Sequence, residues 1–359
     1  MIKTKRLSFD VEEIDKKLGF AEPNFYSTNR EELADTLGIE GATYESVKSD
    51  VIWGLYDALM ADYPDRVSKN PIYNDDRSFT NYEYVVSTGD YNDVKGSFNN
   101  IDTDIKKPKY LVACGIHGWE KASILSTYRL FRDIVTGHNI PARLREGCVI
   151  HFLPIGNPWS LDNNSRWNDN LYIDPDTGIQ TTQGVDINRN FNWNWGKKNV
   201  SSDKVDNVGP SAESEKETQA IANWLRENVK NNKKVELFLD IHNVSVVYNE
   251  IAVVIGLTDN QEYNNRKKIS LKGIDRVVQF WKDKICYADD TLFYTSASMR
   301  DGGMSIFYAS EVLGIPSIDL ELSTYPTGTE TDRENLLPET VAVGAEVIGN
   351  VLMEFYERY

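Results

Sequence analysis

The stretch Leu111-Val-Ala-Cys-Gly-Ile-His117-Gly-Trp-Glu120-Lys121 decides the fold, because an apolar run ends there in a small-residue turn with two polar side chains. A helical pattern follows, in which polar residues separate four apolar ones: Ala122, Leu125, Leu130 and Ile134. This order predicts a buried strand, a loop and then a helix. In open α/β sheets ligands collect at the carboxyl ends of strands, so we expect His117 and Glu120 to lie at such a binding edge.

His117 and Glu120 form an H-x-x-E motif, whose imidazole and carboxylate can bind one zinc ion, since zinc accepts nitrogen and oxygen ligands. The motif alone is weak evidence for a metal. The third ligand is predicted to be His242, which follows the apolar run 235–241 at the carboxyl end of another predicted strand. Two histidines and one glutamate leave one tetrahedral position open, the arrangement typical of catalytic zinc. His151, inside a further strand pattern, is interpreted as a core residue.

The composition indicates a globular protein of one large domain or two ordinary ones, since 40% of the 359 residues are hydrophobic. Three cysteines are too few for a disulfide framework. No apolar run approaches the roughly 18 residues that span a bilayer, and no signal peptide is visible. The net charge of −16 argues against nucleic acid and anionic membranes as partners. We expect a cytoplasmic protein, or one released by a route that the sequence does not show.

Strand and helix patterns alternate along most of the chain. Strands are predicted over six segments: 78–87, 109–114, 148–154, 235–241, 251–256 and 315–322. Helices are predicted over 44–63 and 121–135, from near Ser214, and from Leu337 with Pro338 in the first turn. The order is typical of an α/β fold, in which a central mixed sheet is covered by helices on both faces. Residues 1–43 lack a sustained pattern, so we interpret them as an N-terminal arm or small cap before a main domain over 44–359.

A second motif makes the metal hypothesis specific: Gly184-Val-Asp186-Ile-Asn188-Arg189-Asn190-Phe191. It lies between the H-x-x-E pair and His242, and the predicted late strand contains Asp319-Leu-Glu321. With these parts in this order, the chain resembles the zinc carboxypeptidases of the carboxypeptidase A type from about Tyr44 to Tyr359. The resemblance implies a single large domain with a mostly parallel twisted sheet, a peptidase activity and one Zn²⁺ per chain.

Ser214-Glu215-Lys216-Glu217-Thr218 resembles the family's S-E-x-E-T helix start. These residues independently form a capping-box pattern, in which Ser214 is the N-cap and Glu217 the third helical residue. One part of the chain departs from the family, because Asn157-Pro158 continues with Trp159-Ser160 where the family often has N-P-D-G. We therefore expect a remodelled loop after the strand at 148–154.

The resemblance assigns three zinc ligands: His117, Glu120 and His242. Asp186 corresponds to the carboxylate that accepts a hydrogen bond from the free imidazole N–H of the first ligand and so fixes its tautomer. Asn188 and Arg189 correspond to the pair that binds a substrate's terminal carboxylate. A guanidinium presents a planar fork of donors that matches a carboxylate, which accounts for arginine rather than lysine at this position.

Glu321 corresponds to the catalytic glutamate, which takes a proton from the attacking water and passes it to the leaving amine. Asp319 is its rival, since it lies two residues earlier on the same strand face. Arg166 is the candidate for stabilising the negative charge that develops on the scissile carbonyl. Tyr294 is the candidate for a tyrosine that closes over the substrate, if residues 294–298 form a mobile loop.

Asp240 and Asp319 give a hypothesis about the substrate. Each lies two residues before His242 or Glu321, so on extended strands each points to the same face as that neighbour. In the family these positions form the floor of the pocket for the terminal side chain, and two carboxylates there would suit Lys, Arg or a diamino acid. The alternative is that Asp240 bonds the backbone or Arg189 and has no part in specificity.

These assignments predict a hydrolase that cleaves a peptide amide bond next to a free C-terminal carboxylate, through water activated by the metal. Its partner is a peptide or amide substrate, and the oligomeric state stays open. Two alternatives also stay open. An N-acyl-amino-acid deacylase of the succinylglutamate desuccinylase or aspartoacylase type shares the H-x-x-E and N-R elements, and a catalytically silent binding module keeps the fold alone.

Overall fold

The computed structural model of this protein describes residues 46–87, 91–92, 97–98, 107–137, 144, 147–174, 177–197, 207–244, 250–256, 261–281, 293–298, 301–323 and 333–356. The interpretation of residues 1–43 as an arm or cap lies outside these residues. In the described part of the chain, no helix has both the length and the apolar character needed to cross a bilayer.

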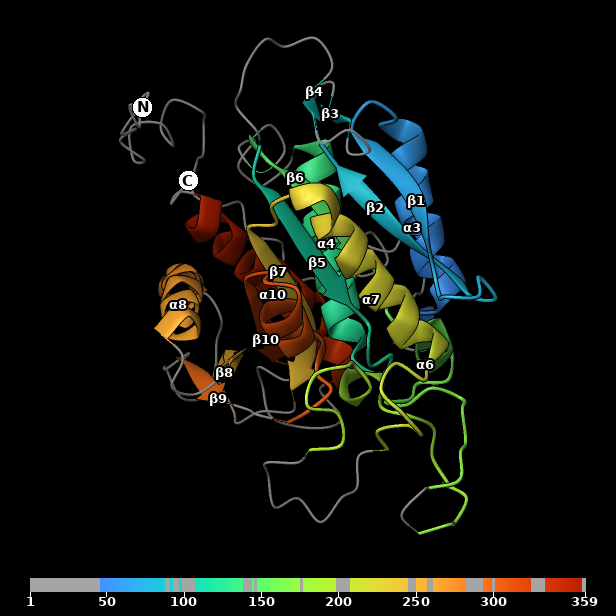
Figure 1. The fold of residues 1–359 in the computed structure, drawn as a ribbon. Helices are drawn as coiled ribbons and strands as arrows, with labels where there is room; N and C mark the ends of the chain where they lie inside the picture. Colours follow the sequence, from blue (N-terminus) through green and yellow to red (C-terminus); the bar gives the residue numbers. More distant parts are fainter. Residues whose placement is uncertain are drawn as a thin grey trace, which may run out of the picture.

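An eight-stranded sheet forms the centre of the fold (Figure 1). From one edge to the other, its strands are β1 (Val67–Tyr73), β2 (Thr80–Val86), β6 (Val149–Leu153), β5 (Lys109–Cys114), β7 (Leu237–Val244), β10 (Ser317–Ser323), β8 (Glu250–Gly256) and β9 (Phe293–Ser298). Strands β6, β5, β7 and β10 run parallel, as do β8 and β9, whereas the pairs β1–β2, β2–β6 and β10–β8 are antiparallel. A separate two-stranded ladder joins β3 (Tyr91–Asn92) and β4 (Ser97–Phe98). The predicted mixed and mostly parallel sheet is confirmed.

Strand β5 is buried along its whole length, so its apolar sequence serves both faces of the sheet. Tyr110, Val112 and Cys114 pack in one apolar core, and Leu111 and Ala113 pack in the other. This division follows from the alternation of side chains along a strand. It also explains why the sequence before the turn is a continuous apolar run rather than an alternating one.

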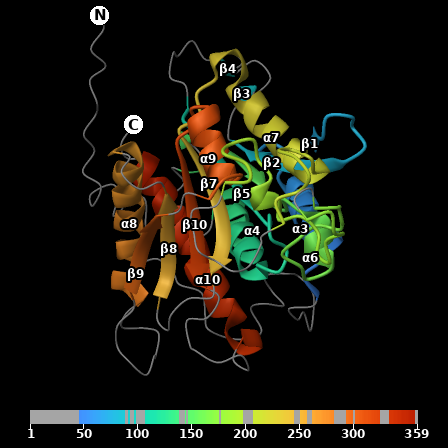
Figure 2. The same cartoon turned by 60° about the horizontal axis from the view of Figure 1, so that its bottom comes forward.

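Helices cover both faces of the sheet (Figures 1 and 2). One apolar core receives side chains from α3 (Ser49–Asp62), α4 (Lys121–Thr136), α8 (Gln261–Trp281) and α10 (Arg333–Tyr356). The other core receives side chains from α7 (Lys216–Val229) and from the short α9 (Ser305–Phe307), which continues into the turn η4 (Tyr308–Val312). The predicted α/β architecture, with a helical layer on each face, is therefore confirmed.

The start of α7 corrects the predicted capping box. The N-cap is Glu215, one residue later than predicted, and its side chain makes no capping hydrogen bond. Ser214 instead donates its hydroxyl hydrogen to Oε1 of Glu215 (2.6 Å), and the side chain of Asn190 accepts a hydrogen bond from the N–H of Glu215 (3.1 Å). Glu217 accepts a hydrogen bond from Asn168 (3.2 Å) rather than turning back to the cap. Long-range contacts from two asparagines therefore replace the local motif.

Helix α10 also differs from its prediction. It starts at Arg333 rather than at Leu337, which places Pro338 in the second turn instead of the first. Because proline has no N–H, the carbonyl of Glu334 receives no intrahelical hydrogen bond from this position. The helix continues through Pro338 despite the loss of this one hydrogen bond. Residues 333–336, which the prediction left outside the helix, form its first turn.

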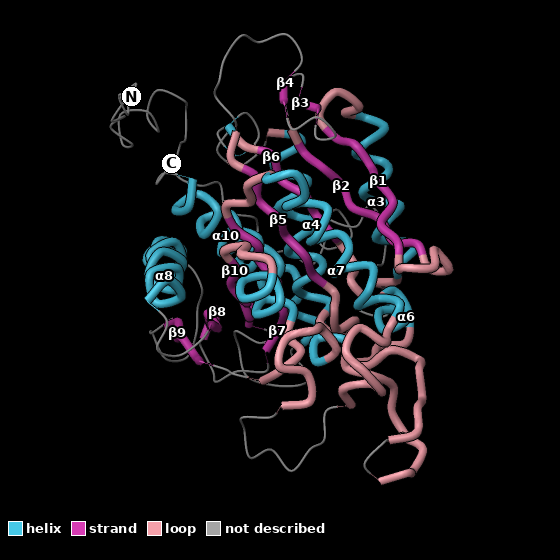
Figure 3. The backbone as a smooth tube through the Cα atoms, in the orientation of Figure 1, coloured by secondary structure: helices cyan, strands magenta, loops and turns pink. Residues whose placement is uncertain are grey.

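The parallel strands β5, β7 and β10 end at the same edge of the sheet, because parallel neighbours point the same way. The loop after β5 carries His117 and Glu120, while His242 and Glu321 lie near the ends of β7 and β10. The short helix α6 (Pro158–Asp162) contacts the loop after β5 through a hydrogen bond. Loop segments between α6 and α7 gather at this end of the molecule (Figure 3). The fold thus brings these four residues to one edge of the sheet, as the sequence predicts.

Candidate metal and active site

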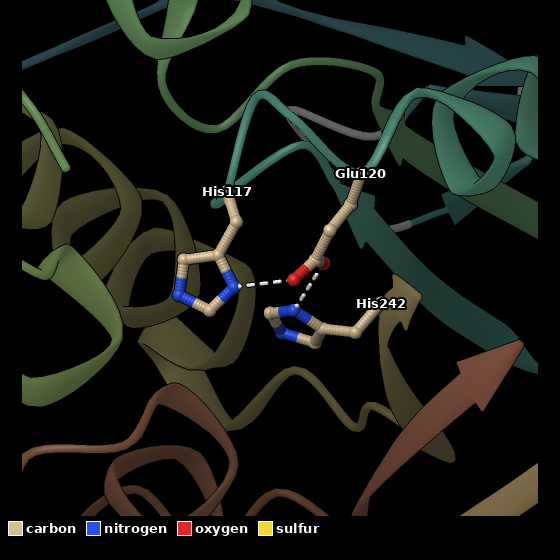
Figure 4. Close-up of side chains that lie close together, drawn as sticks. All are labelled: His117, Glu120 and His242. Atoms are coloured by element: carbon tan, nitrogen blue, oxygen red, sulfur yellow. Dashed lines mark hydrogen bonds and ion pairs between the residues drawn. The ribbon is translucent and has the colours of Figure 1, made fainter. Parts of the chain in front are cut away.

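Three side chains converge at this edge: His117, Glu120 and His242 (Figure 4). The loop after β5 supplies the first two, and β7 supplies the third. Nδ1 of His117 lies 2.8 Å from Oε1 of Glu120, and Nδ1 of His242 lies 2.9 Å from Oε2 of the same carboxylate. One ligand atom from each residue lies within 4.8 Å of the others, and all three residues are buried. The predicted ligand set is therefore assembled in one place.

Two glycines shape the loop that carries the first two ligands. Gly115 has a φ of +66°, a left-handed conformation that glycine adopts without steric cost. Gly118 lies against α6, where a Cβ atom would come within 1.9 Å of the backbone nitrogen of Leu161. The N–H of Gly118 donates a hydrogen bond to the hydroxyl of Ser160 (2.7 Å). Helix α6 therefore fixes the direction in which the ligand loop leaves β5.

Each histidine has a carboxylate at its second ring nitrogen. Nε2 of His117 lies 3.1 Å from Oδ1 of Asp186, and Nε2 of His242 lies 3.2 Å from Oδ2 of Asp240. Both Nδ1 atoms therefore face the centre while the opposite nitrogens are held by carboxylates, the arrangement by which proteins orient metal-binding histidines. Two imidazole nitrogens and a carboxylate also match the donor preference of zinc. The residues present fit a zinc ion.

Buried carboxylates make this centre favourable for positive charge. Burial alone would lower the pKa of His242, but Asp240, Glu120 and Asp319 together raise it well above its ordinary value. Burial alone would raise the pKa of Glu120, but His117 and His242 lower it below its usual range. The side chains would thus stabilise a cation at their centre, and a divalent metal ion would meet that requirement.

Arg166 lies at the same centre and is held by Asp186. Its Nη2 and Nε atoms are 2.7 and 3.0 Å from Oδ2 of Asp186, and its Nη1 is 3.4 Å from Nδ1 of His117. Burial alone would raise the pKa of Asp186, but Arg166 and His117 lower it well below its ordinary value. Asp186 thus connects the predicted oxyanion-stabilising arginine to the first ligand. The structure therefore brings Arg166 and Asp186 beside His117, and the roles of both residues stay predictions.

Glu321 lies beside His242 in the sheet. In the parallel pairing of β7 and β10, Glu321 is opposite His242 and Asp319 is opposite Asp240, so these four side chains share one face. Burial raises the pKa of Glu321 to about 7, with His242 opposing the shift and Glu120 adding to it. Oε2 of Glu321 is buried and has no hydrogen-bond partner among the described residues. A carboxylate with these properties suits proton transfer near neutral pH.

Asn188 and Arg189 lie in the short 3-10 helix η2 (Ile187–Arg189), where Asp186 accepts a hydrogen bond from the N–H of Asn188 (2.9 Å). Arg189 is 8% exposed, and its Nη2 lies 3.6 Å from Oδ2 of Asp301. Sequence reasoning missed Asp301. The Gly302–Gly303 pair after Asp301 allows the close approach to Arg189, because a Cβ on Gly303 would lie 2.0 Å from the carbonyl oxygen of Arg189. That glycine pair is the signal in the sequence for such a contact.

Tyr294 lies in a strand, which corrects the expectation of a mobile loop over residues 294–298. Strand β9 pairs in parallel with β8 at the edge of the sheet, with Tyr294 opposite Ala252. Backbone hydrogen bonds to β8 therefore hold this segment in an extended conformation. The side chain of Tyr294 lies outside the described part of the chain, so its contact with substrate stays a prediction.

Known proteins resemble this chain in sequence. A sequence model of the family described as zinc carboxypeptidase matches residues 54–340. Mast cell carboxypeptidase A of Homo sapiens is 25% identical over 273 residues, which cover 72% of this chain and 60% of that protein. Carboxypeptidase B of Canis lupus familiaris is 29% identical over 148 residues, which cover 39% of this chain and 34% of that protein. The chain thus spans less than two thirds of the length of these curated relatives.

Solved structures show the same fold. Thrombin activatable fibrinolysis inhibitor superimposes with a TM-score of 0.64 at 18% identity, over 91% of this chain and 79% of that chain. Carboxypeptidase A from Helicoverpa armigera superimposes with a TM-score of 0.64 at 18% identity, over 96% of this chain and 81% of that chain. The family model matches most of the residues of this chain, and the chain therefore belongs to the zinc carboxypeptidase family.

Proposed function

We propose that this chain is a zinc metallocarboxypeptidase that hydrolyses the amide bond next to a free C-terminal carboxylate. The observation that supports this most directly is the pairing of Glu321 with His242 across β7 and β10, because Oε2 of Glu321 has no hydrogen-bond partner among the described residues and Glu321 is directly opposite a candidate metal ligand. The substrate-binding candidates lie close by, since Nδ2 of Asn188 is 3.3 Å from Nε2 of His242 and Arg189 is the next residue.

The chemistry follows from these positions. A zinc ion held by the three ligands would polarise the scissile carbonyl and lower the pKa of a water molecule. Glu321 accepts the proton of the attacking water and donates it to the leaving amine. Arg166 stabilises the negative charge that develops on the carbonyl oxygen. Asn188 and Arg189 bind the terminal carboxylate, which limits cleavage to the last residue of the substrate.

Zinc analysis of the purified chain, together with mass spectrometry of a peptide library after incubation, tests the proposal. Stoichiometric zinc with removal of single C-terminal residues is the expected result. Zinc without trimming would contradict the peptidase proposal, and hydrolysis of N-acyl amino acids in a parallel panel would then identify the deacylase alternative. Absence of zinc and of hydrolysis would identify the silent binding module.

Replacing Arg189 by lysine should weaken binding of a free C-terminus by about 10- to 100-fold, the effect of losing a charged hydrogen bond. Lysine keeps the positive charge but not the two parallel donors of the guanidinium. Competitive inhibition by one short peptide, with either a free or an amidated C-terminus, measures the change. Only the inhibition constant of the free peptide should rise, because the amidated peptide offers Arg189 no carboxylate. Equal changes for both peptides would assign Arg189 a different role.

Asp240 and Asp319 support a finer proposal, a preference for a basic C-terminal residue. Both side chains are buried, and Oδ1 of each has no hydrogen-bond partner among the described residues. An ionised carboxylate only accepts hydrogen bonds, so an ammonium or guanidinium group on the substrate would satisfy both atoms. Because the two residues are opposite each other in the sheet, one cationic group can face both.

A peptide that ends in lysine should therefore be cleaved with a kcat/KM at least about tenfold above that of the matched phenylalanine peptide. The Asp319→Asn variant should lose most of this ratio, because it removes one of the two charges. Parallel kinetics on the two peptides give the ratio directly. Faster cleavage of the phenylalanine peptide by the unmodified chain would contradict the preference and leave the peptidase proposal intact.

A further inference from the structure

Asp240 is fully buried and lies two residues before the metal ligand His242 on strand β7. Within the described part of the chain, its oxygen Oδ2 has two polar partners. It lies 3.2 Å from Nε2 of His242, and it accepts a hydrogen bond from the hydroxyl of Ser305 at the start of α9. The second oxygen, Oδ1, is the one that has no partner among the described residues. The two oxygens therefore face different environments.

The tautomer of His242 decides what Oδ2 does. Nδ1 of His242 faces the centre of the ligand set, and a neutral imidazole that binds a metal through Nδ1 carries its proton on Nε2. In the described part of the chain, Nε2 has two polar neighbours, Oδ2 of Asp240 and Nδ2 of Asn188 (3.3 Å). The amide orientation of Asn188 is set by Ser305, whose backbone N–H donates to Oδ1 of Asn188 (2.9 Å). Nδ2 is a donor, so the acceptor for the proton of His242 is Asp240.

We propose that Asp240, held by Ser305, is a positioning residue that fixes the tautomer and orientation of His242 and so raises the zinc affinity of the site. His242 would then have the same kind of support that Asp186 gives to His117 (3.1 Å). Ser305 serves both sides of this arrangement, because its hydroxyl holds Asp240 and its N–H holds Asn188. The inference goes beyond the proposed peptidase function, since it concerns how the metal is held before any substrate binds.

Asp319 offers a matched control for Asp240. It is a buried aspartate directly opposite Asp240 in the parallel pairing, so its carboxylate occupies the same face of the sheet. In the described structure it has neither a hydrogen bond nor an ion pair with His242. Replacing either aspartate by asparagine removes one carboxylate near the centre at nearly constant volume. Only the change at position 240 removes the charged acceptor of the imidazole proton.

Competition with a chromogenic chelator gives the zinc dissociation constant of each variant without substrate. The Asp240→Asn variant should bind zinc about 10- to 100-fold more weakly, the usual effect of losing a carboxylate partner of a ligand histidine. The Asp319→Asn variant should stay within about threefold of the unmodified chain. The Ser305→Ala variant removes no charge, and loss of its single hydroxyl bond should raise the dissociation constant about 2- to 10-fold.

Thermal melting of the metal-free variants checks that each is folded. If Asp240→Asn does not fold, Ser305→Ala still tests the proposal, because it perturbs Asp240 from outside the strand. Equal losses of zinc affinity in Asp240→Asn and Asp319→Asn would overturn the proposal, since they would show an effect of total charge rather than of one hydrogen bond. An unchanged affinity in both Asp240→Asn and Ser305→Ala would overturn it as well. Zinc affinity is measured without hydrolysis, so either result is independent of the peptidase assignment.

Discussion

Replacing Glu321 by glutamine is expected to lower kcat by about 10²- to 10⁴-fold while one zinc ion per chain stays bound. Glutamine has nearly the same shape as glutamate, but its amide cannot accept the proton of the attacking water. Zinc should stay because Glu321 is outside the group of three converging ligands. Peptide hydrolysis and metal analysis on the same preparation measure both parts of the prediction. Near-normal turnover in this variant would show that another group transfers the proton.

The matched comparison is Asp319→Asn, because Asp319 is the rival carboxylate on the same strand. Burial and the neighbouring Glu321 raise the pKa of Asp319 well above its ordinary value. In the pairing of β7 and β10, Asp319 is opposite Asp240, whereas Glu321 is opposite the ligand His242, so turnover of a phenylalanine peptide should change little in this variant. The opposite pattern, with turnover lost in Asp319→Asn and kept in Glu321→Gln, would reverse the two assignments.

The ligand loop could be predicted from the sequence because its signals are local. The apolar run of β5, the left-handed Gly115 and the start of α4 at Lys121 all lie within residues 109–121. His242 could be added because a parallel sheet brings the carboxyl ends of its strands to one edge. The motif around Asp186 then distinguished the zinc carboxypeptidases from other families that share the H-x-x-E pair. Patterns within single segments were therefore enough to predict the fold class and the three metal ligands.

Contacts between distant segments could not be predicted in the same way. Ser305 and Asp240 are 65 residues apart, and no periodicity relates them. The capping box at Ser214 was wrong for the same reason, since Asn190 from the earlier motif supplies a partner at the helix start. Helix α8 was not predicted because polar residues such as Lys267 and Ser270 are buried among its apolar positions. In each case the fold supplies the partner, so a pattern within one segment carries no signal for it.

Replacing His242 by alanine should abolish stoichiometric zinc binding and, with it, hydrolysis. Loss of a ligand should weaken zinc binding by more than about 100-fold, the upper end of the effect of losing an outer contact alone. The change also leaves Asp240, Glu120 and Asp319 without the imidazole that faces them, so the carboxylates of the empty site repel one another. A zinc titration monitored by calorimetry measures the loss of zinc binding, and a peptide hydrolysis assay measures the loss of activity.

His151 provides the matched control for this histidine. It is fully buried in β6, and its Nδ1 lies 2.8 Å from Oε2 of Glu83. Breaking such a buried pair costs about 3–5 kcal/mol, so His151→Ala should melt at a lower temperature than the unmodified chain. Its zinc site is intact, and zinc at about 1,000 times its dissociation constant should still stabilise it by about 4 kcal/mol. His242→Ala should show no such gain. A rise in melting temperature on adding zinc therefore separates a histidine that binds the metal from one that stabilises the core, and an equal rise in both variants would exclude His242 as a ligand.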